Sequence, residues 1–149
     1  MKKTHQRSII LSGWGNVGRT VGIKDSLRAF VRKEVPHDWL FPQVKAMVHH
    51  AGASTTAAVL RSGIPSIVVP FFADQPIWGE KLNRLGVSPS PIPYNHVSEE
   101  TLAEAIEVVL SDEVMKKKAQ ELGQKIRSED GVANAVEAFH RHLGLLRDE

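Results

Sequence analysis

VHHAGASTTAAVLRSGIPSIVVPFFADQPIWGEKL, residues 48–82, carries the clearest structural signals in this chain of 149 residues. The apolar run Ala46–His49 predicts a strand, and the small residues after it predict a tight turn. Alanine and leucine give Ala53–Ser62 good helix propensity, and Gly63 marks the end of that helix. A second apolar run, Ser66–Val69, ends at a proline. This succession predicts two parallel strands joined by a helix.

The same alternation extends along the chain in both directions. Toward the N-terminus, Ser8–Leu11 and roughly Arg28–Val31 predict two further apolar strands. Toward the C-terminus we expect four helices. The first runs from Asp74 to Leu85, and the second begins after Ser98 as N-cap, with Thr101 at the third position. The third covers Asp112–Arg127, and the fourth covers Ala133–Leu143, with Val136, Phe139 and Leu143 on one face. The pattern predicts a single α/β domain over residues 1–149. Its expected fold is Rossmann-like and doubly wound, with three layers, a parallel sheet and a helical C-terminal tail.

The composition narrows the class of protein. Hydrophobic residues make up 42% and charged residues 24% of the chain, which is typical of a globular domain. A net charge of +2 is too small to indicate a nucleic-acid surface, and the absence of cysteine excludes disulfides and thiolate chemistry. No apolar run is long enough to span a bilayer, and the N-terminus does not resemble a signal peptide. We therefore expect a cytoplasmic protein without a transmembrane segment.

The turn after the strand at Ala46–His49 has the features of a phosphate site. The first turn of a helix exposes unpaired N–H groups at the positive end of the helix dipole, and the small side chain of Gly52 lets an anion approach them. Hydroxyls of Ser54 and Thr55 and the ring of His50 add donors. Two alternatives remain open: Ser54 is equally suited to be an N-cap, and a histidine pair at a strand end is often structural.

A second polar pair follows the next strand. Asp74 and Gln75 lie just past Ser66–Val69, so they are expected beside the phosphate site and could bind hydroxyl groups there. Asp74 also precedes Gln75 and a proline at a helix start, so an N-cap role is the alternative. Anion donors at one strand end, with a carboxylate and an amide at the next, suit a ligand with a phosphate end and a polyol end. A nucleotide sugar has this combination.

A glycine-rich loop after the first strand offers a different interpretation. Gly13–Gly18 fits the pattern G-x-G-x-x-G, and Glu34 follows at roughly the distance of a ribose-binding acid. These features are compatible with an NAD(P)-binding dehydrogenase domain. However, only Arg19–Leu27 is available for the crossover helix, which is short for covering a sheet.

The central segment closely resembles the nucleotide-sugar-binding half of family 1 glycosyltransferases, nearest to sterol 3-β-glucosyltransferases and bacterial antibiotic glycosyltransferases. That family has the pattern H-H-G-G-A-G-T-T-A-A, followed by G-x-P-x-x-x-x-P-x-x-x-D-Q-x-x-W. In this chain His49–Ala58 corresponds to the first pattern. The second pattern is matched by Gly63, Pro65, Pro70, Asp74, Gln75 and Trp78. The resemblance covers residues 8 to about 110. It implies that His50, Ser54 and Thr55 face the diphosphate and that Asp74 and Gln75 bind the hexose. Gly13 and Trp14 would line the nucleotide end of a metal-independent, cofactor-free site for a UDP-sugar.

Several departures from the family pattern qualify this prediction. Ala51 and Ser54 replace glycines, and Glu34 stands where many relatives have a tryptophan that stacks on the base, which leaves Trp14 or Trp39 for that role. The family's N-terminal acceptor domain, with its catalytic base, and its usual first strand are not recognisable in the sequence. We expect the donor-binding domain of an inverting transferase that moves a hexose from a UDP-sugar, for example UDP-glucose, to a lipid or sterol-like hydroxyl. We expect no catalytic residue here and no activity without a separate N-terminal half. A non-catalytic interaction module is the further alternative.

Overall fold

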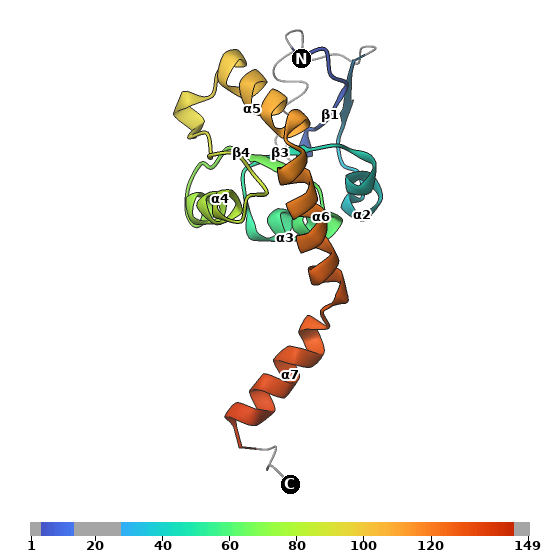
Figure 1. Cartoon of the computed structure of the whole chain (residues 1–149), viewed down its shortest axis with the longest axis vertical. Helices are drawn as coiled ribbons and strands as arrows, with labels where there is room; N and C mark the ends of the chain where they lie inside the picture. The colour runs from blue at the N-terminus through green and yellow to red at the C-terminus, as the bar shows by residue number, and fades with distance from the viewer. Residues whose placement is uncertain (1–3, 14–27, 145–149) are drawn as a thin grey trace.

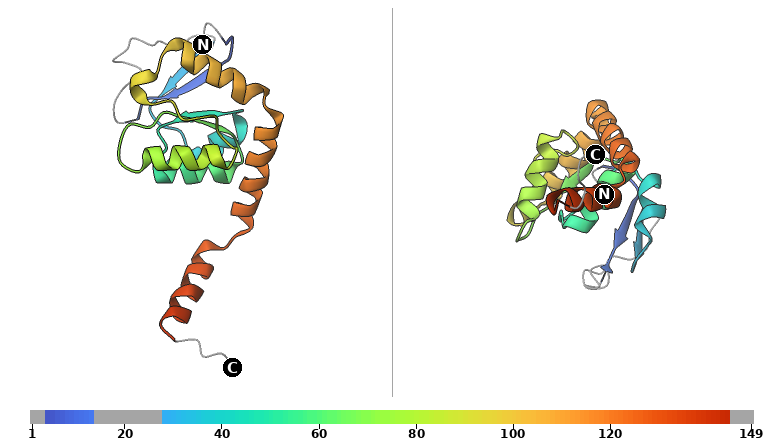
Figure 2. Two further views of the ribbon diagram at one scale, coloured as in Figure 1. Left: turned by 60° about the vertical axis from the view of Figure 1, so that its left-hand side comes forward. Right: turned by 90° about the horizontal axis from the view of Figure 1, so that it is seen from below.

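The computed structural model describes residues 4–13 and 28–144. A body of strands and helices occupies the upper part of Figure 1, and the last helix extends away from it, as the left view of Figure 2 also shows. The segment 14–27 and both chain ends lie outside the described residues, and with them most of the predicted glycine loop.

The four predicted strands form, but they pair two by two. Strand β1 (Ser8–Leu11) pairs in parallel with β2 (Ala29–Arg32), and β3 (Met47–His49) pairs in parallel with β4 (Ser66–Val68). Each predicted strand agrees with the structure to within one residue at either end. Among the described residues, no hydrogen-bonded ladder joins the two pairs into one sheet.

The pair β3–β4 is the middle of three layers. Ile67 of β4 packs against α5 (Glu99–Ser111) and α6 (Glu113–Ser128), whereas Val68, its neighbour, packs against Leu82 of α4 (Gln75–Arg84) on the opposite face. All three residues of β4 are buried, as expected for a parallel strand that is covered on both faces. Figure 1 shows α5 on one side of the pair, with α4 and α3 (Ala53–Ser62) on the other.

Local sequence signals explain where most helices begin and end. Gly63 ends α3 in the left-handed conformation at φ 74°, and Gly86 adopts φ 71° after α4. Ser98 caps α5 in a reciprocal capping box with Thr101, as predicted. The side chain of Asp112 caps α6 by accepting a hydrogen bond from the Met115 N–H at 2.8 Å.

Some elements differ from the prediction. Residues 37–43, between β2 and β3, form the short helices α2 (His37–Leu40) and η2 (Phe41–Gln43), which bury Leu40 and Phe41. A further short helix, η3 (Tyr94–His96), lies in the predicted loop at 87–97. Such single turns lack the periodicity that identifies longer helices from sequence.

The last helix, α7 (Gly131–His142), forms nearly where it is predicted. It begins two residues early, because Asp130 caps it through the Ala133 N–H at 3.0 Å. Its apolar side chains share a face, as predicted, but none is buried: Val132, Val136, Phe139 and Leu143 are all exposed.

Candidate functional site

The carboxyl ends of β3 and β4 lie at the same edge. His49 is the register partner of Val68, and the His49 carbonyl accepts a hydrogen bond from the Val69 N–H at 2.9 Å. The loop that leads from β3 into α3 and the loop that leads from β4 into α4 therefore start side by side. This edge is where ligands bind in doubly wound folds.

The start of α3 exposes free amide donors. Gly52 is the N-cap residue, it supplies no side-chain cap, and its carbonyl accepts the first helical hydrogen bond, from the Thr56 N–H at 2.9 Å. The N–H groups of Ala53, Ser54 and Thr55 precede that bond, so they have no acceptor within the helix. Together with the helix dipole they form a site suited to an anion.

His50 lies against this helix start. A Cβ atom built on Gly52 would lie 2.5 Å from His50 Nε2, so the imidazole occupies the space that any larger residue at position 52 would need. His50 is an exposed residue, and its Nε2 lies beside Gly52, the N-cap of α3. His50 and Gly52 thus lie side by side where α3 begins, with Ser54 and Thr55 in the first turn; that these residues bind a diphosphate stays a prediction.

His49 is buried and has a structural role, whereas His50 is exposed. Its side chain is 7% exposed, and Nδ1 accepts a hydrogen bond from the Ala51 N–H at 3.2 Å. Burial lowers the pKa of His49 to about 4, with a smaller contribution from the charge of His50, so the ring is neutral at pH 7. The buried ring holds Ala51 at φ 64°, and this turn directs the chain into α3.

Asp74 and Gln75 lie at the start of α4, on the neighbouring loop. Asp74 occupies the N-cap position without making a side-chain cap; its Oδ2 instead accepts a hydrogen bond from Trp78 Nε1 at 2.9 Å. The buried Gln75 uses its Oε1 to accept from the N–H groups of Phe71 at 2.8 Å and Phe72 at 3.2 Å. Gln75 therefore orders the loop and has only its NH₂ group left for a ligand, whereas the carboxylate of Asp74 remains exposed.

The capping alternative is wrong for Ser54; Asp74 does occupy the N-cap position, as that alternative predicts, but its side chain makes no cap. Ser54 is the second residue of α3, because the helix begins at Ala53 after Gly52, and Asp74 bonds to Trp78 rather than to a backbone N–H. The contact between Asp74 and Trp78 was missed from sequence. Their spacing of four residues on one helix was the signal that could have found it.

Of the two remaining predicted site residues, only Gly13, just after β1, is described. Gly13 is exposed, adopts φ 52° and donates its N–H to the Lys33 carbonyl at 2.9 Å. A Cβ atom built on Gly13 would meet no atom within 4 Å, so none of the other described site residues lies against this face of Gly13. Trp14 lies outside the described residues. Trp39, the other tryptophan considered for base stacking, is 61% exposed and is not part of the core.

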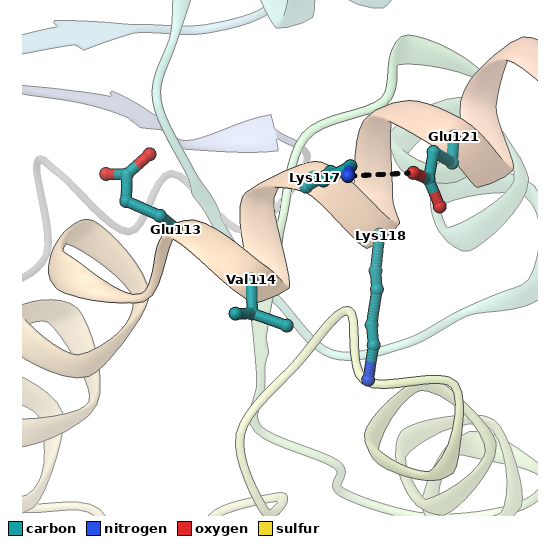
Figure 3. Close-up of a pocket in the computed structure, with 5 residues that line it drawn as sticks. All are labelled: Glu113, Val114, Lys117, Lys118 and Glu121. Carbon is teal, nitrogen blue, oxygen red and sulfur yellow. Dashed lines mark ion pairs between the residues drawn. The ribbon is translucent and has the colours of Figure 1, made fainter.

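A hollow on the surface, with a volume of about 460 Å³, lies along α6 (Figure 3). Glu113, Val114, Lys117, Lys118 and Glu121 line it, and Lys117 pairs with Glu121 at 3.9 Å. These are the charged side chains of an exposed helix face, with partners one turn apart. They offer no set of convergent donors like that at the start of α3.

The described residues, 4–13 and 28–144, contain no group of three His, Cys, Asp or Glu side chains that could hold a metal ion. No helix in this part of the chain is long and apolar enough to cross a membrane.

Comparison with known proteins identifies the family. Residues 17–139 match the family described as erythromycin biosynthesis protein CIII-like, C-terminal domain. The chain belongs to this family of glycosyltransferase domains. The sterol 3-beta-glucosyltransferase UGT80A2 of Arabidopsis thaliana is 49% identical over 143 residues, which cover 96% of this chain and 22% of that protein. The sterol 3-beta-glucosyltransferase of Aspergillus terreus is 40% identical over 148 residues, covering 96% of this chain and 10% of that protein.

This glycosyltransferase domain spans about a fifth or less of the length of these relatives. Solved structures confirm the fold of a GT-B C-terminal domain. The glycotransferase of kitacinnamycin matches with a TM-score of 0.75 and 24% identity over 91% of this chain and 34% of that chain. The glycosyltransferase VinC, solved in complex with dTDP, matches with a TM-score of 0.72 and 20% identity. The match covers 83% of this chain and 31% of that chain. These findings favour the glycosyltransferase interpretation over that of a dehydrogenase domain.

Proposed function

We propose that this domain binds the nucleotide-sugar donor of an inverting glycosyltransferase. The hexose would pass from a UDP-sugar, for example UDP-glucose, to the hydroxyl group of a lipid or sterol-like acceptor. The single observation that carries the proposal is the start of α3, where unpaired amide N–H groups and His50 converge at the carboxyl end of β3. The sterol glucosyltransferase relatives and the solved complex of VinC with dTDP support the class of donor and acceptor.

The donor would be held in two parts. The diphosphate would accept hydrogen bonds from the amides of Ala53, Ser54 and Thr55, with His50 as a further donor. Because the helix dipole and these donors supply positive potential, we propose that the domain itself holds the diphosphate without a metal ion. The hexose would lie toward the loop between β4 and α4, where Asp74 accepts from its hydroxyls and the NH₂ group of Gln75 donates to them.

In this proposal the acceptor and the base that deprotonates it are supplied by an N-terminal half. General-base catalysis requires the base within hydrogen-bond reach of the acceptor hydroxyl, and attack on the anomeric carbon requires both partners to be oriented. We therefore expect the isolated 149-residue chain to bind UDP weakly and to transfer no sugar. A calorimetric titration with UDP and with NADH tests the class of ligand: heat with NADH and none with UDP would contradict the proposal.

Replacing His50 with alanine should weaken UDP binding more than it weakens folding. Loss of one hydrogen bond to the diphosphate should cost about 1–2 kcal/mol of binding, or roughly five- to thirtyfold in Kd. The loss is modest because water can reach the exposed His50. The measurement is calorimetry with UDP, together with a thermal melt of each protein. His142→Ala, at an exposed position on α7, is the matched control. An unchanged Kd with a lowered Tm would show that His50 acts only in folding.

Replacing Asp74 with asparagine should reduce binding of the sugar but not of the nucleotide. Asparagine retains an oxygen that can accept from Trp78 Nε1, so the loop should keep its shape, but the charge that accepts sugar hydroxyls is lost. UDP-glucose should lose about 1–2 kcal/mol of its advantage over UDP. Titrations of both ligands measure this, with Glu80→Gln on the exposed side of α4 as control. Equal changes for both ligands, or none, would mean that Asp74 does not contact the hexose.

A further inference from the structure

An exposed aromatic patch lies beside the proposed hexose site. It consists of Phe71, Phe72 and Tyr94, whose exposed fractions are 56%, 71% and 58%. Phe72 is the most exposed of the phenylalanine, tyrosine and tryptophan residues that the structure describes. Asp74, the proposed contact of the hexose, comes two residues after Phe72 and is the only charged residue in the segment 69–78. The surface next to the sugar is therefore apolar and aromatic.

The loop holds this patch in place although its rings are exposed. The Phe72 carbonyl accepts a hydrogen bond from the Gln75 N–H at 3.3 Å, and the Phe72 N–H donates to the Gln75 side-chain oxygen at 3.2 Å. The ring of Phe71 stacks on that of Tyr94, with the centroids 5.6 Å apart and the planes inclined by 13°. The stacked pair is a flat apolar surface, and a surface that is already fixed loses little conformational entropy when a ligand covers it.

Backbone pairing sets the position of the patch relative to the proposed diphosphate site. The start of α3 follows β3, and the loop that carries Phe71 follows β4, the neighbouring strand. On the other side of β4, the Ile92 N–H donates to the Val68 carbonyl at 2.9 Å, and Tyr94 comes two residues later. The order along this edge is therefore the start of α3, the loop after β4, and then Tyr94. Because Phe71 stacks on Tyr94, the stacked pair lies on the side of that loop away from α3.

An inverting transfer requires the acceptor on that side. The acceptor hydroxyl oxygen bonds to the anomeric carbon as the bond from this carbon to the diphosphate breaks. UDP leaves with the electron pair, and the hydroxyl proton passes to the base of the N-terminal half. Attack in line with the leaving group comes from the side opposite the diphosphate, with the two reacting atoms about 3–3.5 Å apart. The apolar body of a lipid or sterol-like acceptor must therefore begin next to the hexose, on the side away from α3.

We propose that Phe72 and the stacked pair of Phe71 and Tyr94 form one wall of the acceptor site and contact the flat apolar ring system of the acceptor. This assignment rests on the proposed donor function, in which the N-terminal half supplies the base and the rest of the pocket. Apolar contact with a large planar ligand buries surface without needing hydrogen-bond partners. The aromatic wall therefore favours an apolar ring system over a hydroxylated acceptor of similar size.

The test is a titration of the full chain with cholesterol carried by methyl-β-cyclodextrin, followed by NMR, with the carrier alone as the blank. The ring protons of the three aromatic residues should show intermolecular NOEs to the sterol. Replacing Phe72 with alanine should weaken sterol binding roughly tenfold, because the apolar area of the ring is no longer buried by the ligand. Phe139→Ala, at a similarly exposed position on α7, is the matched control and should bind the sterol as the wild type does.

The shape of the loop is followed in the same samples. The indole N–H signal of Trp78, which donates to Asp74, and the Tm should both stay unchanged in Phe72→Ala, since the bonds to Gln75 are made by the backbone at position 72. Phe72→Leu keeps an apolar side chain and should lose less sterol affinity than Phe72→Ala. This second variant provides the comparison if alanine lowers the Tm.

The outcomes separate this assignment from the donor function, because UDP is titrated into the same chain. Weaker sterol binding by Phe72→Ala, with the control unchanged, supports the aromatic wall. No contact of these rings with the sterol up to its solubility limit, or an equal loss in Phe139→Ala, would overturn it, and UDP shifts at the start of α3 would then leave the donor function standing. Sterol contact without any UDP shift would contradict the donor function and, with it, the assignment of the patch to an acceptor. Dimerisation that covers these rings would overturn the assignment in favour of a second copy of this chain.

Discussion

Lowering the pH from 6.5 to 4 should remove about 3 kcal/mol from the free energy of unfolding through His49 alone. The pKa of its buried ring is lowered from 6.5 to about 4, a difference of about 2.5 units at 1.36 kcal/mol each. Between these pH values the unfolded chain binds more protons than the folded chain. The free energy of unfolding therefore falls as the pH falls through this window. Well above pH 6.5, where His49 is neutral in both the folded and the unfolded chain, this loss is absent.

The measurement is urea denaturation at several pH values, with His49→Asn as the matched variant. The asparagine oxygen can take the place of Nδ1 and accept from the Ala51 N–H, but it does not titrate. The wild type should lose about 3 kcal/mol more than the variant between pH 6.5 and 4. Identical pH profiles for the two proteins would show that His49 is not the group that titrates.

Replacing Gly123 with alanine should destabilise the chain by about 2 kcal/mol, although alanine is the better helix former. A Cβ atom at this position of α6 would lie 2.7 Å from the Gly63 Cα, 2.8 Å from its nitrogen and 2.9 Å from the Leu60 carbonyl oxygen. All three are backbone atoms of α3 and its end, so the two helices must move apart. Overpacking of this kind costs typically 1–3 kcal/mol.

Gly131→Ala provides the control, because a Cβ atom there meets nothing within 4 Å in α7. Without a steric term, helix propensity alone should leave its stability unchanged or raise it by up to about 1 kcal/mol. Thermal or urea unfolding of both variants gives the comparison. A Gly123→Ala protein as stable as the wild type would mean that α3 and α6 do not pack as closely as the structure shows.

The sequence was sufficient to locate the strands and the longer helices, because each has a local signal. The run Ser66–Val69, the glycine at position 63 and the capping pair Ser98–Thr101 all predict elements that the structure confirms. The turn around His50 was predictable for a related reason: a strand end, small residues and a helix start follow one another directly. Its role as a binding site stays a prediction.

Features that depend on distant partners were not predictable. The separation of the strands into two pairs is a property of backbone pairing, which composition and periodicity do not reveal. The amphipathic pattern of α7 predicts a buried face, yet Phe139 is 62% exposed, because periodicity does not say whether a partner surface is present. The use of the Gln75 side-chain oxygen to order its own loop also depends on the folded geometry.

The most direct test of the donor site is an NMR titration of the ¹⁵N-labelled chain with UDP. If the start of α3 holds the diphosphate, the amide signals of Gly52, Ala53, Ser54 and Thr55 should shift in a saturable way, together with the ring signals of His50. The amides of α6, along the hollow in Figure 3, should stay in place. Shifts confined to α6, or no saturable shift at the start of α3, would contradict the assignment of the donor site.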